Sequence, residues 1–122
     1  MADLCKFRFH SISKIDEDVN ELNFEAQGFI DQREDSLIWY FKNENSYKFI
    51  IYKDKLDVNV NNSKYTFINN KKTEAIISVD NYLYKASIYT NFIVINKDYI
   101  DINYTLDFST FKGNYRISLE LY

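Results

Sequence analysis

Residue types that perform acid–base and nucleophilic chemistry are scarce in this 122-residue sequence, which contains one histidine and one cysteine. A Ser/His/Asp or Cys/His catalytic set would have to use His10. Because His10 alternates in step with Lys6 and Arg8, we expect it on the outer, polar face of the first strand. Cys5 alternates with Phe7 instead, so we expect a small core residue. We therefore predict no catalytic residues and a protein that is not an enzyme.

Acidic residues are numerous, but their spacing matches no known site. The pairs Asp16 with Asp18 and Glu34 with Asp35 lie in predicted turns, where carboxylates cap the backbone and stay solvated. They lack the Asp/Asn ladder and closing Glu of a calcium loop, and one His with one Cys is too few for a zinc site. Two isolated glycines cannot form a phosphate-binding loop. The sequence therefore predicts no metal and no cofactor.

Composition and charge restrict the class of protein further. Hydrophobic residues make up 46% of the chain and aromatic residues 18%, enough for one folded domain over residues 1–122. The net charge is −3 and the basic residues are dispersed, so nucleic acid is not an expected partner. No apolar stretch is long enough for a signal sequence or a membrane span. The lack of such a stretch and the presence of a single cysteine together favour a reducing, cytoplasmic location.

The elements that must position any site have a period of two. Apolar residues alternate with polar ones over residues 100–108 and 115–121, and shorter stretches near residues 5–9, 22–26 and 56–60 do the same. Asn- and Asp-rich clusters separate them, and we expect these residues to supply the positive-φ turn positions. The pattern predicts an all-β fold, a closed antiparallel up-and-down barrel of about eight to ten strands. A β-sandwich is the alternative, and a short helical turn near residues 70–76 is the one exception we expect.

The aromatic side chains are the most informative candidates for a binding site. A barrel of about eight strands is wide enough either to be filled by side chains or to hold one small ligand. Its limited width favours a filled interior, whereas tyrosine hydroxyls, which need partners when buried, favour a cavity for a small amphipathic or aromatic ligand. The residues expected to face the interior are Phe7, Phe9, Phe24, Trp39, Tyr84, Tyr104 and Phe108.

One predicted hairpin does not have a polar face. Residues 37–41 are apolar at every position, and residues 49–52 repeat this across the turn at residues 43–46. Only one face can point into a barrel, so the other needs cover from a second copy or a protein partner. The candidates for this contact surface are Ile38, Tyr40, Ile50 and Tyr52.

Three strand patterns resemble the YwiB-like family of bacterial calycin-type β-barrels. They are residues 24–29 (FEAQGF), residues 100–106 (IDINYTL) and residues 114–119 (NYRISL). The middle of the chain departs from the family, because Asn-rich segments replace its glycines. The resemblance implies a lipocalin-like barrel, and the family has no established activity.

Two ligand sites of better-known calycins are missing. Lipocalins begin with a Gly-x-Trp signature, whereas the one tryptophan here is Trp39. Intracellular fatty-acid-binding proteins use an Arg-x-Tyr pair, but Arg116 is followed at that spacing by Ser118, and its alternation places it on the outer face. We therefore consider two functions, a ligand-binding barrel and, as the alternative, an assembly module with a filled interior that associates through the apolar hairpin.

Overall fold

The chain forms a ten-stranded antiparallel barrel in a computed structural model that describes residues 2–110 and 112–122. The strands are β1 (Ala2–Ile15), β2 (Asp18–Gln32), β3 (Leu37–Lys42), β4 (Ser46–Ile51), β5 (Leu56–Val60), β6 (Ser63–Phe67), β7 (Lys72–Val79), β8 (Tyr82–Ile95), β9 (Tyr99–Asp107) and β10 (Lys112–Leu121). Each strand pairs with its neighbours in sequence, and β1 pairs with β10 to close the barrel. This confirms the predicted closed up-and-down barrel.

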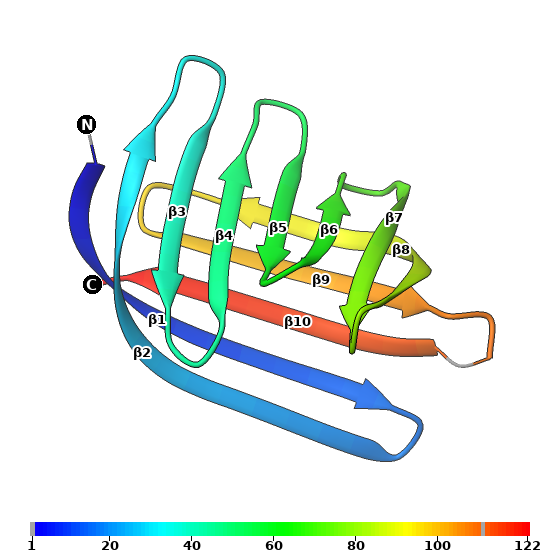
Figure 1. Cartoon of the computed structure of the whole chain (residues 1–122). Coiled ribbons are helices and arrows are strands. Elements are labelled where there is room, and N and C mark those ends of the chain that lie inside the picture. Colours follow the sequence, from blue (N-terminus) through cyan, green and yellow to red (C-terminus); the bar gives the residue numbers. More distant parts are fainter. Residues whose placement is uncertain (1, 111) are drawn as a thin grey trace.

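The ten strands differ in length and direction. Figure 1 shows the short strands β3 to β7 side by side, crossing the direction of the longer β1, β8, β9 and β10. The long β2 joins the two groups, because it pairs with β1 over most of its length and with β3 only from Gly28 to Gln32. The described residues include no helix capable of crossing a membrane.

Turns depend on Asn and Asp, as the sequence predicts. Among the described residues, positive φ angles occur at Ser109 and at five Asn or Asp residues: Asp16, Asn61, Asn70, Asp80 and Asn81. These side chains tolerate the left-handed region better than most residues do, so they replace glycine in the tight connections. The expected helical turn near residues 70–76 is wrong: β7 begins at Lys72 and buries Ala75 against the core. Tertiary packing overrides the local helix preference of that Lys- and Glu-containing segment.

Gly28 allows β2 to pass from one group of strands to the other. A Cβ atom at this position would overlap the Tyr40 carbonyl oxygen and lie 2.8 Å from the Phe41 Cα. Both atoms belong to the backbone of β3, which cannot give way as a flexible side chain can. The close approach of the two strands therefore requires glycine.

A β-bulge interrupts the alternation of inward and outward side chains along β8. Pairing with β9 shifts register between Thr90 and Phe92. Ile88 and Thr90 point inward before the bulge, and Ile93 is the first residue after the bulge that points inward. One extra residue, Asn91, therefore exchanges the two faces of β8.

Candidate functional site

The structure places most of the predicted interior residues inside the barrel. Phe7, Phe9, Trp39 and Tyr104 are buried, and Phe24 and Phe108 are partly buried against the same core. The placement of Tyr84 in the interior is wrong, because its side chain is 50% exposed. It has the inward alternation of Ala86 and Ile88, but β8 pairs with β9 only from Ser87 onward. Tyr84 therefore lies where the β7–β8 hairpin projects beyond the barrel.

Aromatic rings fill the part of the interior between β1, β2, β3 and β4. Ring centroids lie 5.1 Å apart for Phe7 and Phe41, 4.9 Å for Phe41 and Tyr47, and 4.8 Å for Phe9 and Phe24. Such contacts are typical of a close-packed core. The sequence left filling and a ligand cavity open, and in this part of the barrel the rings fill the space.

A row of hydroxyl groups crosses the interior beyond these rings. Direct cross-strand pairing joins Thr90 of β8 to Tyr104 of β9, Tyr104 to Tyr115 of β10, and Tyr115 to Ser13 of β1. Thr90 is fully buried, and its Oγ1 has no hydrogen-bond partner among the described residues. An unpaired buried hydroxyl costs about 1–3 kcal/mol. The described residues therefore leave the buried Thr90 hydroxyl without a hydrogen-bond partner.

The phenol groups of Tyr65, Tyr104 and Tyr115 interact electrostatically in this region. Burial raises the pKa of Tyr104 far above its ordinary value, with smaller contributions from Tyr65 and Tyr115. Burial also raises the pKa of Tyr65 and of Tyr115. The rings of Tyr104 and Tyr115 stack at 5.2 Å, and Phe67 meets Tyr104 edge-on at 4.7 Å. The hydroxyls are therefore neutral donors and acceptors held between aromatic walls.

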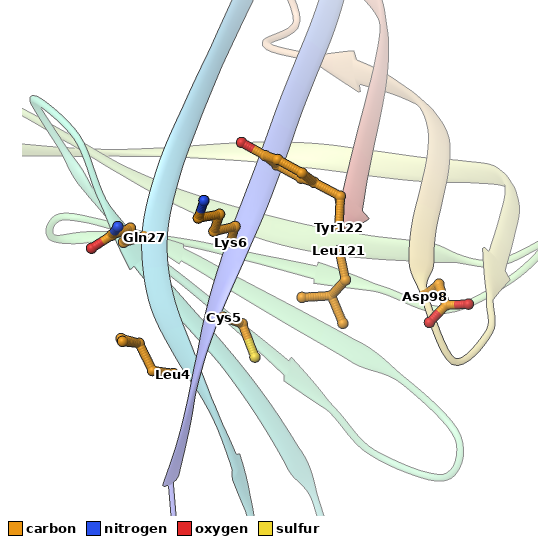
Figure 2. Close-up of a pocket in the computed structure, with 7 residues that line it drawn as sticks. All are labelled: Leu4, Cys5, Lys6, Gln27, Asp98, Leu121 and Tyr122. Atoms are coloured by element: carbon orange, nitrogen blue, oxygen red, sulfur yellow. The ribbon is translucent and has the colours of Figure 1, made fainter.

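A cleft of about 690 Å³ opens where β1 begins and β10 ends. Figure 2 shows its lining, and we call it the end cleft: Leu4, Cys5, Lys6, Gln27, Asp98, Leu121 and Tyr122. Leu4 is 80% exposed. The Lys6 ammonium forms no ion pair with the side chains of residues 4–110 and 112–122. In the view of Figure 2, Asp98 lies apart from Lys6 and Gln27, with Leu121 between them. The end cleft thus combines an apolar surface with a cation at one end and a carboxylate at the other.

Tyr122 is held in place as one wall of the end cleft. The Arg8 guanidinium carbon lies 4.5 Å from the centre of its ring, a cation–π contact. A hydrogen bond with Glu25 is the main cause of the raised pKa of Tyr122. Its backbone N–H donates to the Lys6 carbonyl oxygen at 3.2 Å. These contacts hold the ring beside Lys6.

The outer face of β9, β10 and β1 contains the residues that could suggest catalysis. His10, Ser118 and Asp101 lie in one cross-strand row. The Ser118 hydroxyl donates to Asp101 at 3.4 Å, whereas the His10 Nε2 lies 3.3 Å from Glu21. No hydrogen bond joins Ser118 to His10 among the described residues. The arrangement therefore lacks the contact between hydroxyl and imidazole that activates a serine nucleophile.

Arg116 lies on the outer face, as its alternation predicts. Its guanidinium donates two hydrogen bonds to Asp101, of 3.1 Å and 2.7 Å, and its side chain is 53% exposed. An arginine in this position cannot hold a carboxylate inside the barrel. The expected difference from fatty-acid-binding proteins is confirmed at this residue.

The hairpin of β3 and β4 is apolar on both faces, and the structure shows which face is outside. Trp39, Phe41 and Phe49 are buried inside the barrel. The four contact candidates, Ile38, Tyr40, Ile50 and Tyr52, alternate with them and are partly exposed. Phe29 of β2 adds its ring, which stacks on Tyr40 at 4.9 Å and is 38% exposed. We call Phe29, Ile38, Tyr40 and Ile50 the outer patch.

Comparison with known proteins identifies the fold. The sequence matches no protein-family model and no curated protein. Among solved structures, the chain is similar to the crystal structure of the YwiB protein from Bacillus subtilis, with a TM-score of 0.73 and 13% identity. The similarity covers 99% of this chain and 93% of that one. The chain therefore has a YwiB-like fold.

Sequence reasoning did not find the end cleft or the unpaired hydroxyl of Thr90. The end cleft combines residues from both ends of the chain, and only the β1–β10 pairing brings them together. The sequence contained one indication of the end cleft: Leu4 is apolar, yet its alternation places it with Lys6 and Arg8 on the outer, otherwise polar face of β1. Thr90 has the inward alternation of Ala86 and Ile88, but nothing in the sequence indicates that its hydroxyl lacks a hydrogen-bond partner among the described residues.

Proposed function

We propose that this barrel is a non-enzymatic binding protein that takes a small amphipathic ligand in the end cleft. The observation that supports this most is the volume of about 690 Å³, because ligand pockets usually measure about 300–1,000 Å³. The aromatic rings that fill the interior between β1 and β4 favour a site at the end of the barrel over one inside it.

The lining indicates how such a ligand would lie. Leu4, Leu121 and the Tyr122 ring offer surface to an apolar body. Lys6 and Gln27 offer a cation and an amide to its polar head. Because Asp98 carries negative charge on the other side of Leu121, an anionic head is placed near Lys6 and repelled from the opposite end.

Isothermal titration calorimetry with sodium octyl sulfate, below its micelle concentration, tests the proposal. We expect saturable binding of one molecule per chain. Leu4→Asp should abolish it by placing a charge against the apolar chain. Val19→Asp is the matched control, since Val19 is 60% exposed near the opposite end of the β1–β2 hairpin. Absent binding, or equal loss in both variants, would refute the proposal.

The polar end is tested with a second pair of variants. Lys6→Gln should weaken octyl sulfate binding about fivefold, the effect of losing one partly screened charge contact of about 1 kcal/mol. Lys14→Gln, an exposed lysine further along β1, should leave it unchanged. Octanol should bind wild type and Lys6→Gln equally, because it has no charge. An equal loss for octanol would assign the Lys6 effect to packing and contradict the head-group assignment.

The second candidate function is self-association through the outer patch. It is supported by the partly exposed Phe29–Tyr40 stack beside Ile38 and Ile50, which are direct cross-strand neighbours. Contiguous apolar surface of this kind is typical of contact sites. Sedimentation equilibrium should then show a dimer at high micromolar concentration. The double variant Ile38→Lys with Ile50→Lys should be a folded monomer, and Ile76→Lys on β7 should remain dimeric. A monomeric wild-type protein would refute this candidate.

A further inference from the structure

The sheet of long strands has an open edge that neither proposed function uses. β2 pairs with β1 from Asp18 to Asp31, but with β3 only from Gly28 to Gln32. Residues 18–27 of β2 therefore have a strand on one side only, and we call them the free edge. In Figure 1 this part of β2 lies along the lower margin of the molecule, below β1. We propose that the free edge binds an extended, lysine- or arginine-rich segment of another protein, which adds to the sheet as a further strand.

The backbone of the free edge supplies the hydrogen-bonding groups for such an addition. On the side away from β1, no described strand or turn is hydrogen-bonded to it. A row of N–H and C=O groups of this kind can pair with another chain. Residues 82–86 of β8 also pair on one side only, but that stretch is half as long. The free edge is therefore the better place for an added strand.

Side chains on both faces of the free edge are open to solvent. Val19, on the outer face, is 60% exposed, and Leu22, on the inner face, is 48% exposed. Residues directly opposite each other on paired strands share a face. An added strand would therefore cover Leu22 with one of its own side chains, and a valine there would bury apolar surface on both strands.

Charge along this part of the chain selects a basic guest. Residues 16–32 contain six acidic side chains and no lysine or arginine. Glu21 and Glu25 lie on the outer face of the free edge, and their side chains are 54% and 62% exposed. Their basic neighbours, His10 at 3.3 Å and Arg8 at 3.6 Å, belong to β1 on the other side. A guest with lysine at alternate positions would place positive charge opposite both glutamates.

The same charges disfavour a second copy of this chain as the occupant. Antiparallel pairing of two free edges centred on Asn23 would set Glu21 of one copy directly opposite Glu25 of the other. Like charges in that position are destabilising. Lysine and proline, the residues that commonly prevent strand addition at an edge, are both missing from residues 16–32. The free edge is thus suited to pairing with an unlike chain.

Fluorescence anisotropy with the labelled, capped peptide KTKVKTK tests the inference. Paired antiparallel with residues 19–25, this peptide sets its valine opposite Leu22 and lysines opposite Glu21 and Glu25. We expect saturable binding of one peptide per chain at about 150 mM salt, where charges are screened beyond about 8 Å. The acidic peptide ETEVETE should not bind. KTKVKTK with N-methylated interior amides keeps every charge but loses its N–H donors, and it should bind at least about tenfold more weakly.

A matched pair of protein variants locates the binding. Glu21→Lys should weaken KTKVKTK binding about tenfold, because it reverses a charge beside the added strand. Glu120→Lys makes the same change on the outer face of β10, which has a strand on each side, and should alter binding less than about twofold. Hydrogen exchange in the complex should slow at alternate amides of residues 18–27. The double variant Ile38→Lys with Ile50→Lys should bind the peptide as wild type does, which separates the free edge from the outer patch.

The remaining outcomes would each overturn the inference. If the N-methylated peptide binds as tightly as KTKVKTK, charge alone holds the peptide and no strand is added. Equal losses in Glu21→Lys and Glu120→Lys, or slowed exchange outside residues 18–27, would place the peptide elsewhere. A wild-type protein that dimerises without peptide, with slowed exchange at residues 18–27, would make a second copy the occupant.

Discussion

Gly28 of β2 and Phe41 of β3 are direct cross-strand partners, and the two backbones approach so closely that a Cβ on Gly28 would lie 2.8 Å from the Phe41 Cα. The same contact places Phe41 against Phe7 and Tyr47 in the filled part of the interior. The bend of β2 and the packing of the aromatic core therefore depend on one another.

Gly28→Ala should lower the free energy of unfolding by about 3 kcal/mol, because the added methyl group meets backbone atoms that cannot move independently. Gly113→Ala is the matched control. Its Cβ would meet side-chain atoms of Tyr115 and Ile15, at 2.8 Å and 2.9 Å, which can shift. We expect a loss of about 1 kcal/mol there. Urea denaturation measures both, and equal losses would contradict the account of the β2 bend.

Leu106→Ala should lower the free energy of unfolding by about 2–5 kcal/mol, since Leu106 is buried in the core and the change leaves a cavity. Arg116→Ala should cost under about 1 kcal/mol, because the Arg116–Asp101 pair is on the outer surface and partly screened by water. Chemical denaturation of both variants checks the assigned faces. A large loss in Arg116→Ala would show that this ion pair is part of the structural core.

Stability should fall above pH 10, and Tyr104 should account for part of the fall. Burial raises the pKa of Tyr104, so the folded chain keeps this proton while the unfolded chain loses it near the ordinary value of about 10. Its contribution is complete below pH 10 and is lost as the pH rises. From pH 10 to pH 11 the wild type should lose about 1 kcal/mol more than Tyr104→Phe.

Urea denaturation at pH 9, 10 and 11 measures this difference. The exposed Tyr82→Phe is the control and should follow the wild type. If Tyr104→Phe lost stability as steeply as the wild type between pH 10 and 11, Tyr104 would have to ionise in the folded protein, against its observed burial.

The alternation of side chains was sufficient to predict most of the fold. Ile100, Ile102, Tyr104 and Leu106 all face inward, and all are buried, because β9 is regular and pairs along its length on both sides. Alternation alone misplaced Tyr84, since it gives the direction of a side chain but not where the barrel ends. Similarly, alternation along β8 holds only as far as Thr90, because the bulge between Thr90 and Phe92 exchanges the faces of the residues that follow it.

The candidate sites were less predictable than the fold. Lys6 and Tyr122 lie side by side only because the two terminal strands pair, and nothing in the spacing of these residues along the chain indicates it. Most of the outer patch was predictable, because Ile38, Tyr40 and Ile50 lie in one hairpin, whereas Phe29 comes from β2 and was not predicted. A site formed by residues close together in the sequence can be recognised from the sequence pattern. A site formed by pairing of strands distant in the sequence cannot.

The most direct test of ligand binding in the end cleft is a titration of isotope-labelled protein with octyl sulfate, followed by amide chemical shifts. The account predicts saturable shifts concentrated at Leu4, Lys6, Gln27, Leu121 and Tyr122, with one dissociation constant fitting all of them. It also predicts no comparable shift in the outer patch. Shifts that do not saturate, or that concentrate on Phe29, Ile38, Tyr40 and Ile50 instead, would contradict it.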